Sequence, residues 1–256
     1  TTAGSGCGKG ELVRAVRLHH DGLEVEDLDQ PVPGEGEVLV RVHAAAITRD
    51  ELEWPVDRLP AVPSYELSGV IVDTGEDVFA LTPFDRDGVA AEYASVPSEV
   101  LAPKPPSLTH VEAAALPMGA LSAWQGLVVH GRMQPGERVL VTGASGGVGH
   151  LAVQLARQVG AEAVDEGPAQ LVFDTVGGDL PEGDRVVTIA AEVPGATYFV
   201  VEPDREQLVE LARLADAGDL VPAIDSTFSL ERAGEAFDRV AAHGKRGKVV
   251  LDVAGG

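Results

Sequence analysis

The sequence is poor in cysteine and in basic residues. Cys7 is the single cysteine, so the chain can form no internal disulfide and no cysteine-based zinc cluster. Only 19 lysines and arginines stand against 41 aspartates and glutamates, which gives a formal net charge of −22. This field repels phosphate backbones and anionic lipids, so we expect neither nucleic acid nor a membrane as a partner.

Long hydrophobic runs are also absent. No apolar stretch reaches the roughly 20 residues that cross a bilayer, and we expect a cytoplasmic protein. Apolar material is nevertheless abundant, because 45% of the 256 residues are hydrophobic. That is enough to build the core of one large domain or of two intertwined ones. Residues 1–10, "TTAGSGCGKG", match a phosphate-binding loop poorly and are predicted to be a flexible tail.

The first hundred residues have the pattern of a β-rich module. Residues 37–47 alternate as a strand, and residues 68–81 predict two strands joined by a "DTG" turn. The proline-rich segment 102–107 closes the module like a linker. A helical period follows, in which Thr109 and Glu112 have the spacing of a capping box. A second helix is predicted to end near Gly131.

The second half is centred on a glycine-rich turn. A buried strand over 137–143 leads into Gly143, Gly146 and Gly149, and an amphipathic helix follows. Such a turn lets the backbone approach a pyrophosphate, which the free N–H groups at the start of the helix also attract. The alternative is a turn that only packs the helix against the strand. Further elements are predicted as strands over 171–174, 185–190, 197–201 and 248–253, and helices over 204–218 and 229–242.

Several stretches together resemble a known family. They are "PGEGEVLVRVHAAAIT", "GVAAEYASVP", "EAAALPMGALSAWQGL", "PGERVLVTGASGGVG", "LVFDTVGG" and "GKRGKVVL". The sequence resembles the medium-chain dehydrogenase/reductase superfamily, in its zinc-free quinone oxidoreductase-like branch. The resemblance implies an α/β fold with a GroES-like β domain from residues 11–108 and 226–256. A truncated Rossmann-type doubly wound parallel sheet would lie within residues 109–225.

The resemblance also implies an activity. Relatives reduce a quinone or an activated C=C bond with a nicotinamide cofactor, usually as homodimers, in a cleft between the domains. A small apolar substrate would lie near Thr48 and Tyr65. Both stand where zinc-bearing relatives have metal ligands, and we therefore expect no zinc. The cofactor, NADH or NADPH, would contact a set of residues from the second half and the final strand: Ser122, Gly143, Ser145, Gly146, Gly147, Val148, Gly149, Asp165, Val176, Gly177 and Lys248.

The chain departs from the family after the glycine turn. Between Gly160 and Leu171 there is room only for a possible strand at 161–164 and the connector "DEGPAQ". Because parallel crossovers usually need a dozen or more residues, either 161–164 is a loop or the crossover is a strap without a helix. Asp165 stands where an acidic residue accepts from an adenosine ribose, and Asp165 with Glu166 favours NADH over NADPH. We expect fewer strands, an adenosine site open to solvent, and weak cofactor binding or none.

Two functions therefore stay open at this point. The first is a zinc-independent, NAD(P)H-dependent reductase of a quinone or enone, serving bacterial secondary metabolism. The second is a cofactor-independent enzyme on the same scaffold, a cyclase, isomerase or eliminase acting on a polyketide-like substrate. Its rate would come from orientation and acid–base groups. The catalytic candidates for this alternative are Arg49, Asp50, Tyr65 and Glu66.

Overall fold

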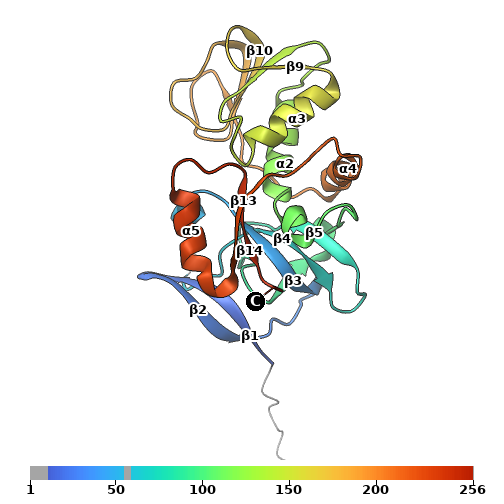
Figure 1. Ribbon diagram of the computed structural model, residues 1–256, viewed down its shortest axis with the longest axis vertical. Helices are drawn as coiled ribbons and strands as arrows, with labels where there is room; N and C mark the ends of the chain where they lie inside the picture. Colours follow the sequence, from blue (N-terminus) through green and yellow to red (C-terminus); the bar gives the residue numbers. More distant parts are fainter. Residues whose placement is uncertain (1–10, 55–58, 256) are drawn as a thin grey trace, which may run out of the picture.

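The computed structural model describes residues 11–54 and 59–255. The predicted flexible tail, residues 1–10, lies outside these ranges. Figure 1 shows two parts stacked along the long axis of the molecule, a β-rich part below and an α/β part above. The chain enters the β-rich part first and returns to it at the end. The predicted division at residues 109 and 225 stays a prediction.

The β-rich part contains strands from both ends of the chain. Seven strands form a sheet in the order β13-β14-β3-β4-β5-β7, with β6 paired to β3. Strands β1 and β2 form a separate antiparallel pair. The bounds are β1 Leu12–His19, β2 Gly22–Asp29, β3 Glu37–Ile47, β4 Glu66–Ile71, β5 Asp77–Leu81, β6 Tyr93–Pro97, β7 Ala102–Pro103, β13 Ile224–Ser229 and β14 Lys248–Asp252. The predicted hairpin over 68–81 is confirmed as β4 and β5.

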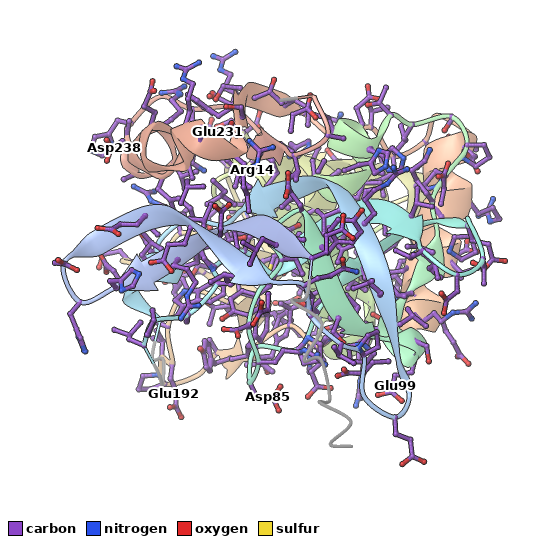
Figure 2. The ribbon with its side chains drawn as sticks, turned by 90° about the horizontal axis from the view of Figure 1, so that it is seen from below. Arg14, Asp85, Glu99, Glu192, Glu231 and Asp238 are labelled. Atoms are coloured by element: carbon purple, nitrogen blue, oxygen red, sulfur yellow. The ribbon has the colours of Figure 1, made fainter. Side chains whose placement is uncertain are left out.

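The last strand of the chain determines where the site is built. Strand β14 runs antiparallel to β3, with Val249 opposite Ile47. Lys248, at the start of β14, therefore lies beside the end of β3, where Thr48 follows. The β1–β2 pair is held to the same body by Arg14, which forms an ion pair with Glu92 and another with Glu231; Figure 2 labels Arg14 and Glu231.

The α/β part is built on a parallel sheet. Its five strands have the order β12-β11-β10-β8-β9, and every neighbouring pair is parallel. Their bounds are β8 Arg138–Val141, β9 Glu162–Val164, β10 Ala169–Asp174, β11 Gly183–Thr188 and β12 Thr197–Tyr198. Helices α2 Pro117–Trp124, α3 Gly149–Val159 and α4 Arg205–Asp216 contribute to the core of this part, with a π-helical turn, η3, over Gln125–His130. Helix α5 Ala233–Ala241 packs on the β-rich part beside β13 and β14 (Figure 1), and α1 His110–Ala114 packs on β3 and β4. The predicted capping box of Thr109 and Glu112 is confirmed at the start of α1.

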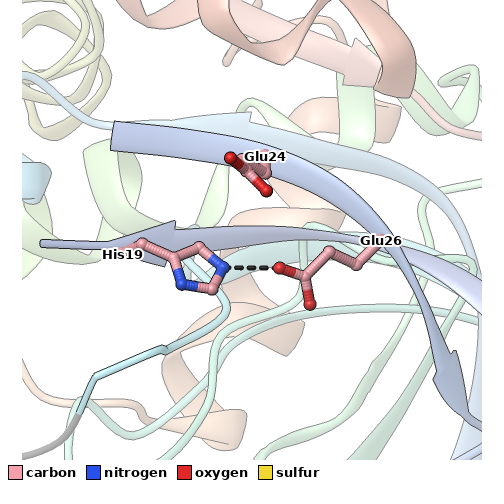
Figure 3. A group of neighbouring side chains, drawn as sticks. All are labelled: His19, Glu24 and Glu26. Carbon is pink, nitrogen blue, oxygen red and sulfur yellow. Dashed lines mark hydrogen bonds and ion pairs between the residues drawn. The ribbon is translucent and has the colours of Figure 1, made fainter. Parts of the chain in front are cut away.

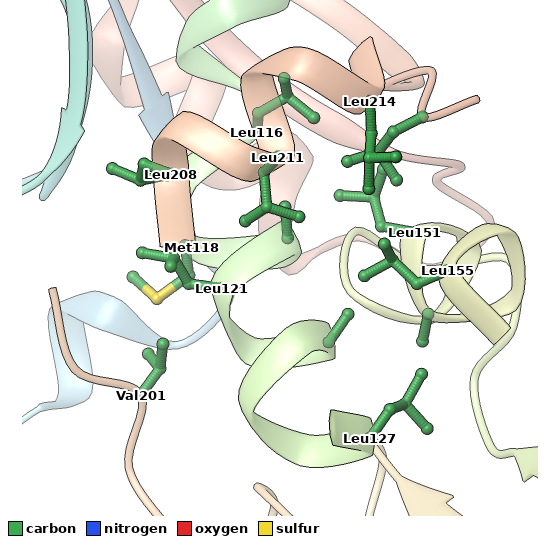
Figure 4. Close-up of a cluster of buried hydrophobic side chains, with 14 of the residues drawn as sticks. Leu116, Met118, Leu121, Leu127, Leu151, Leu155, Val201, Leu208, Leu211 and Leu214 are labelled. Carbon is green, nitrogen blue, oxygen red and sulfur yellow. The ribbon is translucent and has the colours of Figure 1, made fainter. Parts of the chain in front are cut away.

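The faces of the parallel sheet are covered differently. Val139, Val141 and Phe173 belong to the largest apolar core, together with residues of α2, η3, α3 and α4. Figure 4 shows the leucines of these helices that fill it. On the other face, Leu140 and Val172 belong to a separate small cluster. With the segment between Gly160 and Leu171 shortened, the helices of the largest apolar core cover one face of the parallel sheet.

The connection from β9 to β10 is a strap without a helix, which decides between the alternatives left open by the sequence. Four exposed residues, Asp165 to Pro168, join the strands. A Cβ on Gly167 would lie 3.6 Å from the Arg138 guanidinium, so the strap passes over the side of β8 that carries Arg138. The strap must step about 10 Å sideways across β8 and return about 10 Å along it, from the level of Leu140 to that of Glu137, which makes about 14 Å in all. Five extended links reach about 17 Å, so a strap this short can make the crossing.

Candidate active site

The glycine-rich turn has the geometry that its sequence predicts. Gly143 has a positive φ of 67°, and the N–H of Gly146 donates to the Gly143 carbonyl at 2.8 Å. A Cβ on Gly149 would lie 2.1 Å from that same carbonyl oxygen, so only glycine allows α3 to start this close to the strand. Ser145 is exposed at the tip of the turn.

Helix α2 packs directly against this turn. A Cβ on Gly119 would lie 2.7 Å from the carbonyl oxygen of Gly147. Val148 is partly buried against the core of the α/β part. Ser122, on the same helix as Gly119, is 2% exposed. Its contact with a cofactor stays a prediction.

Asp174, at the carboxyl end of β10, holds the loop that follows this strand. Its carboxylate accepts hydrogen bonds from Thr142 Oγ1 at 2.6 Å, from Thr188 Oγ1 at 2.8 Å and from the Gly177 N–H at 3.1 Å. Burial alone would raise the pKa of Asp174, but these bonds outweigh it and leave that pKa below its usual value. The loop that carries Val176 and Gly177 is thereby held beside the turn, and a Cβ on Gly143 would lie 2.6 Å from Val176 Cγ2.

Lys248, Glu66 and Thr48 form a buried polar cluster next to the turn. The Lys248 ammonium donates to Glu66 Oε1 and to Thr48 Oγ1, the latter at 2.9 Å. The Thr48 hydroxyl donates to Glu66 Oε1 at 3.2 Å, and the Met118 N–H donates to Glu66 Oε2 at 2.8 Å. The Glu66 side chain is 0% exposed and the Lys248 side chain 7%. The structure thus joins a predicted cofactor residue to two predicted catalytic residues.

Lys248 and His150 both lie against the glycine turn. A Cβ on Gly147 would lie 3.0 Å from Lys248 Cδ, so the lysine stem runs along the turn. His150 Nδ1 lies 2.7 Å from the Gly146 carbonyl oxygen, while His150 Nε2 accepts from the Ala223 N–H at 3.1 Å. The proton of the neutral ring is therefore on Nδ1. Burial lowers the pKa of His150, which keeps the ring neutral.

Glu51 is a buried acid that no motif in the sequence indicates. Its carboxyl accepts from the Thr48 N–H at 2.8 Å and from the Ser64 N–H at 3.0 Å. Burial raises the pKa of Glu51 to about 8, against the opposing effect of these bonds and of the Lys248 charge. The spacing of Thr48 and Glu51 could have indicated this bond, because an acidic side chain three residues after a backbone N–H can reach back and accept from it.

The remaining catalytic candidates lie outside the cluster. Arg49 and Asp50 are exposed and face each other at 3.7 Å. Tyr65 is 7% exposed, and its ring packs against Trp54 and Phe84, with centroids 6.0 and 5.2 Å away. Asp165 is exposed after β9. The structure thus brings Glu66 and Thr48 together and leaves Arg49 and Asp50 at the surface.

Comparison with known proteins identifies the family. The Alcohol dehydrogenase GroES-like domain matches residues 34–106, and the Zinc-binding dehydrogenase family matches residues 149–251. The solved quinone oxidoreductase of Thermus thermophilus is 29% identical, with a TM-score of 0.79 over 94% of this chain and 100% of that one. The chain belongs to the medium-chain dehydrogenase/reductase superfamily, in its quinone oxidoreductase-like branch.

Curated relatives in this superfamily have longer chains in the aligned region. A probable zinc-binding mitochondrial oxidoreductase of Arthroderma benhamiae is 29% identical over 90% of this chain and 93% of its own length. That alignment takes 308 positions, more than the 256 residues of this chain, so it contains gaps on this side. The 2-methylene-furan-3-one reductase of Solanum lycopersicum is 29% identical over 85% of this chain and 72% of its own length.

One group of side chains among the described residues has the composition and spacing to hold a metal ion. It consists of His19, Glu24 and Glu26 on the β1–β2 pair, whose ligand atoms lie within 4.8 Å of one another (Figure 3). His19 Nε2 lies 2.5 Å from Glu26 Oε1. This group is on the β1–β2 pair, whereas the buried polar cluster lies at the ends of β3 and β14. Zinc independence of the cleft stays a prediction.

The structure also bears on the expected partners. In the described part of the chain, no helix is both long and apolar enough to cross a membrane. The predicted homodimer and cytoplasmic location stay predictions.

Proposed function

We propose that this protein is a zinc-independent, NAD(P)H-dependent reductase of quinones or enones. One observation carries the proposal: the glycine turn and a buried lysine–glutamate–threonine cluster lie against each other, through Gly147 and Lys248. The glycine turn can bind the phosphates of a cofactor, and Lys248 beside it can donate a hydrogen bond to a substrate carbonyl. Reduction of a C=C bond conjugated to a carbonyl needs both. The names of relatives agree, since one is a 2-methylene-furan-3-one reductase and another, a quinone oxidoreductase, has been solved with NADPH.

The residues at the turn fit the pyrophosphate of a nicotinamide cofactor. A Cβ on Gly146 would meet only the Gly143 oxygen, at 3.2 Å, so the space beside Gly146 is open. Helix α3 starts at Gly149 and adds its N-terminal N–H groups and dipole. When bound, the cofactor supplies a hydride to the carbon β to the substrate carbonyl. The chain must position that carbon and stabilise the charge that develops on the carbonyl oxygen.

Lys248, rather than Thr48, is the donor for that oxygen. The single hydroxyl hydrogen of Thr48 is directed to Glu66, and its oxygen accepts from Lys248, so Thr48 has no hydrogen left for a substrate. An ammonium has three N–H groups, and among the described residues Lys248 uses them on Thr48 and Glu66 only. The remaining N–H is free to bind the carbonyl oxygen. Glu66 and Thr48 then act as positioning residues for Lys248.

The proposal is tested by cofactor titration and enone turnover. We expect NADH or NADPH to bind, and enone reduction to require it. In the double variant Lys248→Met, Glu66→Gln, which leaves no unpaired buried charge, kcat should fall about 100-fold or more, while the cofactor Kd changes less than about threefold. Lys245→Met, in the segment before β14, is the matched lysine control and should keep kcat.

The same experiment decides against the cofactor-independent alternative or in its favour. Conversion of a substrate with no nicotinamide present, together with no binding of either cofactor at millimolar concentration, would contradict a reductase. The relatives' names give that alternative no support. A role in bacterial secondary metabolism is a further prediction, to be checked by which substrates the purified protein reduces.

A further inference from the structure

We propose that the site takes its nicotinamide donor almost entirely through the nicotinamide mononucleotide half. Reduced nicotinamide mononucleotide should then bind and react nearly as well as NADH. This inference rests on the proposed function and names the form of cofactor that the site recognises. It follows from the contrast between an intact turn and an unsupported adenosine side.

The turn side of the site is rigidly built. The Gly146 carbonyl is held by His150, whose other ring nitrogen accepts from Ala223. The opposite loop is held by Asp174, through the N–H groups of Val176 and Gly177. Val176 is 64% exposed and so presents an apolar surface beside the turn. A phosphate and an adjoining nicotinamide riboside would meet preformed contacts here.

The adenosine side has no comparable support. In open parallel sheets, a dinucleotide extends beyond the carboxyl ends of the strands on both sides of the glycine turn. Here the strand on the adenosine side is β9, which has three residues and forms the edge of the sheet. The chain returns from it by the strap, Asp165 to Pro168, and all of these residues are exposed. An adenine placed beyond β9 would bury little surface, and little burial yields little affinity.

Charged groups do not make up for the missing contacts on the adenosine side. Asp165 and Glu166 are the ionisable groups of the strap, and both are exposed carboxylates. Asp165 can accept from a ribose hydroxyl, but water competes for an exposed hydrogen bond, which limits the gain to about fivefold. The added adenosine phosphate is repelled by both carboxylates and by the net charge of −22. The adenosine half should therefore improve binding by less than about tenfold.

Calorimetry with NADH, reduced nicotinamide mononucleotide and AMP tests the inference without relying on turnover. We expect Kd values for the two reduced donors within about tenfold of each other, and no displacement of either by millimolar AMP. The ratio of kcat/KM for the two donors with one enone should lie within the same limit. The Thermus thermophilus quinone oxidoreductase, solved with NADPH, is the control; there, removal of the adenosine half should cost more than about 100-fold.

Two variants test which side of the site, the turn or the strap, contributes the affinity for the cofactor. Gly146→Val fills the space beside the turn and should weaken both donors equally, whereas Asp165→Asn should change the NADH affinity by less than about threefold. Tight NADH binding with more than about tenfold weaker mononucleotide binding would overturn this inference and leave the proposed reductase intact. If neither donor binds and no cofactor-dependent turnover occurs, the proposed function itself fails.

Discussion

Breaking the buried pair of Lys248 and Glu66 on one side only should be far more damaging than removing it entirely. In Lys248→Met, the Glu66 carboxylate keeps the Met118 N–H and the Thr48 hydroxyl but loses its cation. Glu66 is 0% exposed, so water cannot replace that partner. Leaving a buried charge uncompensated costs about 3–5 kcal/mol.

The double variant Lys248→Met, Glu66→Gln removes both charges and keeps an acceptor for the Met118 N–H. Replacing a buried ion pair by neutral groups of similar volume is often close to neutral, so this variant should lie within about 1 kcal/mol of the wild type. The two single losses must then sum to much more than the double loss. We expect a coupling free energy of at least about 3 kcal/mol.

Urea denaturation at pH 7 measures all four proteins, provided that their m-values agree. The matched control is the exposed pair Arg213 and Glu210, whose side chains are 60% and 41% exposed; its coupling should stay below about 0.5 kcal/mol. Raising the salt concentration should weaken the control pair and leave the buried pair unchanged. Additive losses for Lys248 and Glu66 would refute the buried ion pair and with it the proposed donor.

The other predictions concern an acid, a metal, the cofactor and the turn. Because burial raises the pKa of Glu51 from 4.5 to about 8, the folded chain binds one proton more than the unfolded chain between these values. Stability should therefore fall by about 1.4 kcal/mol per pH unit from about pH 5.5 to 7, and less steeply as the pH approaches 8; Glu51→Gln should flatten that slope in urea titrations repeated across pH. Metal analysis of protein purified without chelators should find zinc well below one per chain, and one tightly held zinc would contradict this. NADH should be preferred to NADPH, because Asp165 and Glu166 repel a 2′-phosphate, and a tenfold preference for NADPH would contradict that assignment. Gly149→Ala should destabilise the chain by about 1–3 kcal/mol and abolish cofactor binding, as shown by thermal unfolding and calorimetry.

Local chemistry made much of the fold predictable. The capping box of Thr109 and Glu112 fixes a helix start through side-chain bonds that span three residues. The glycine turn is equally local, since the carbonyl of Gly143 blocks any side chain at Gly149. The three-residue strand β9 was too short to show a period, so the sequence left it open between a strand and a loop.

The cluster itself could be predicted only in part. Lys248 and Glu66 are separated by 182 residues, and a sequence pattern carries no sign of which distant side chains will pair. Resemblance to the family made each residue a candidate, but Lys248 as a cofactor contact and Glu66 as a catalytic residue. Arg49 and Asp50 came forward with them because they adjoin Thr48 in the chain, yet their side chains are exposed. Glu51 went unnoticed although its bond to the Thr48 N–H is local.

The position of the shortened segment explains how the chain keeps a fold and a site without a full adenosine half. Strand β8, which delivers the glycine turn, lies inside the sheet between β10 and β9. Its residues Val139 and Val141 pack under α2 and α3, so the turn is anchored by the main core. The shortening acts on β9 and the strap, at the edge, where the opposite face contributes only a small cluster around Leu140 and Val172. Loss of material at that edge removes contacts to a ligand rather than contacts within the core, and its cost should therefore appear in cofactor affinity and not in folding.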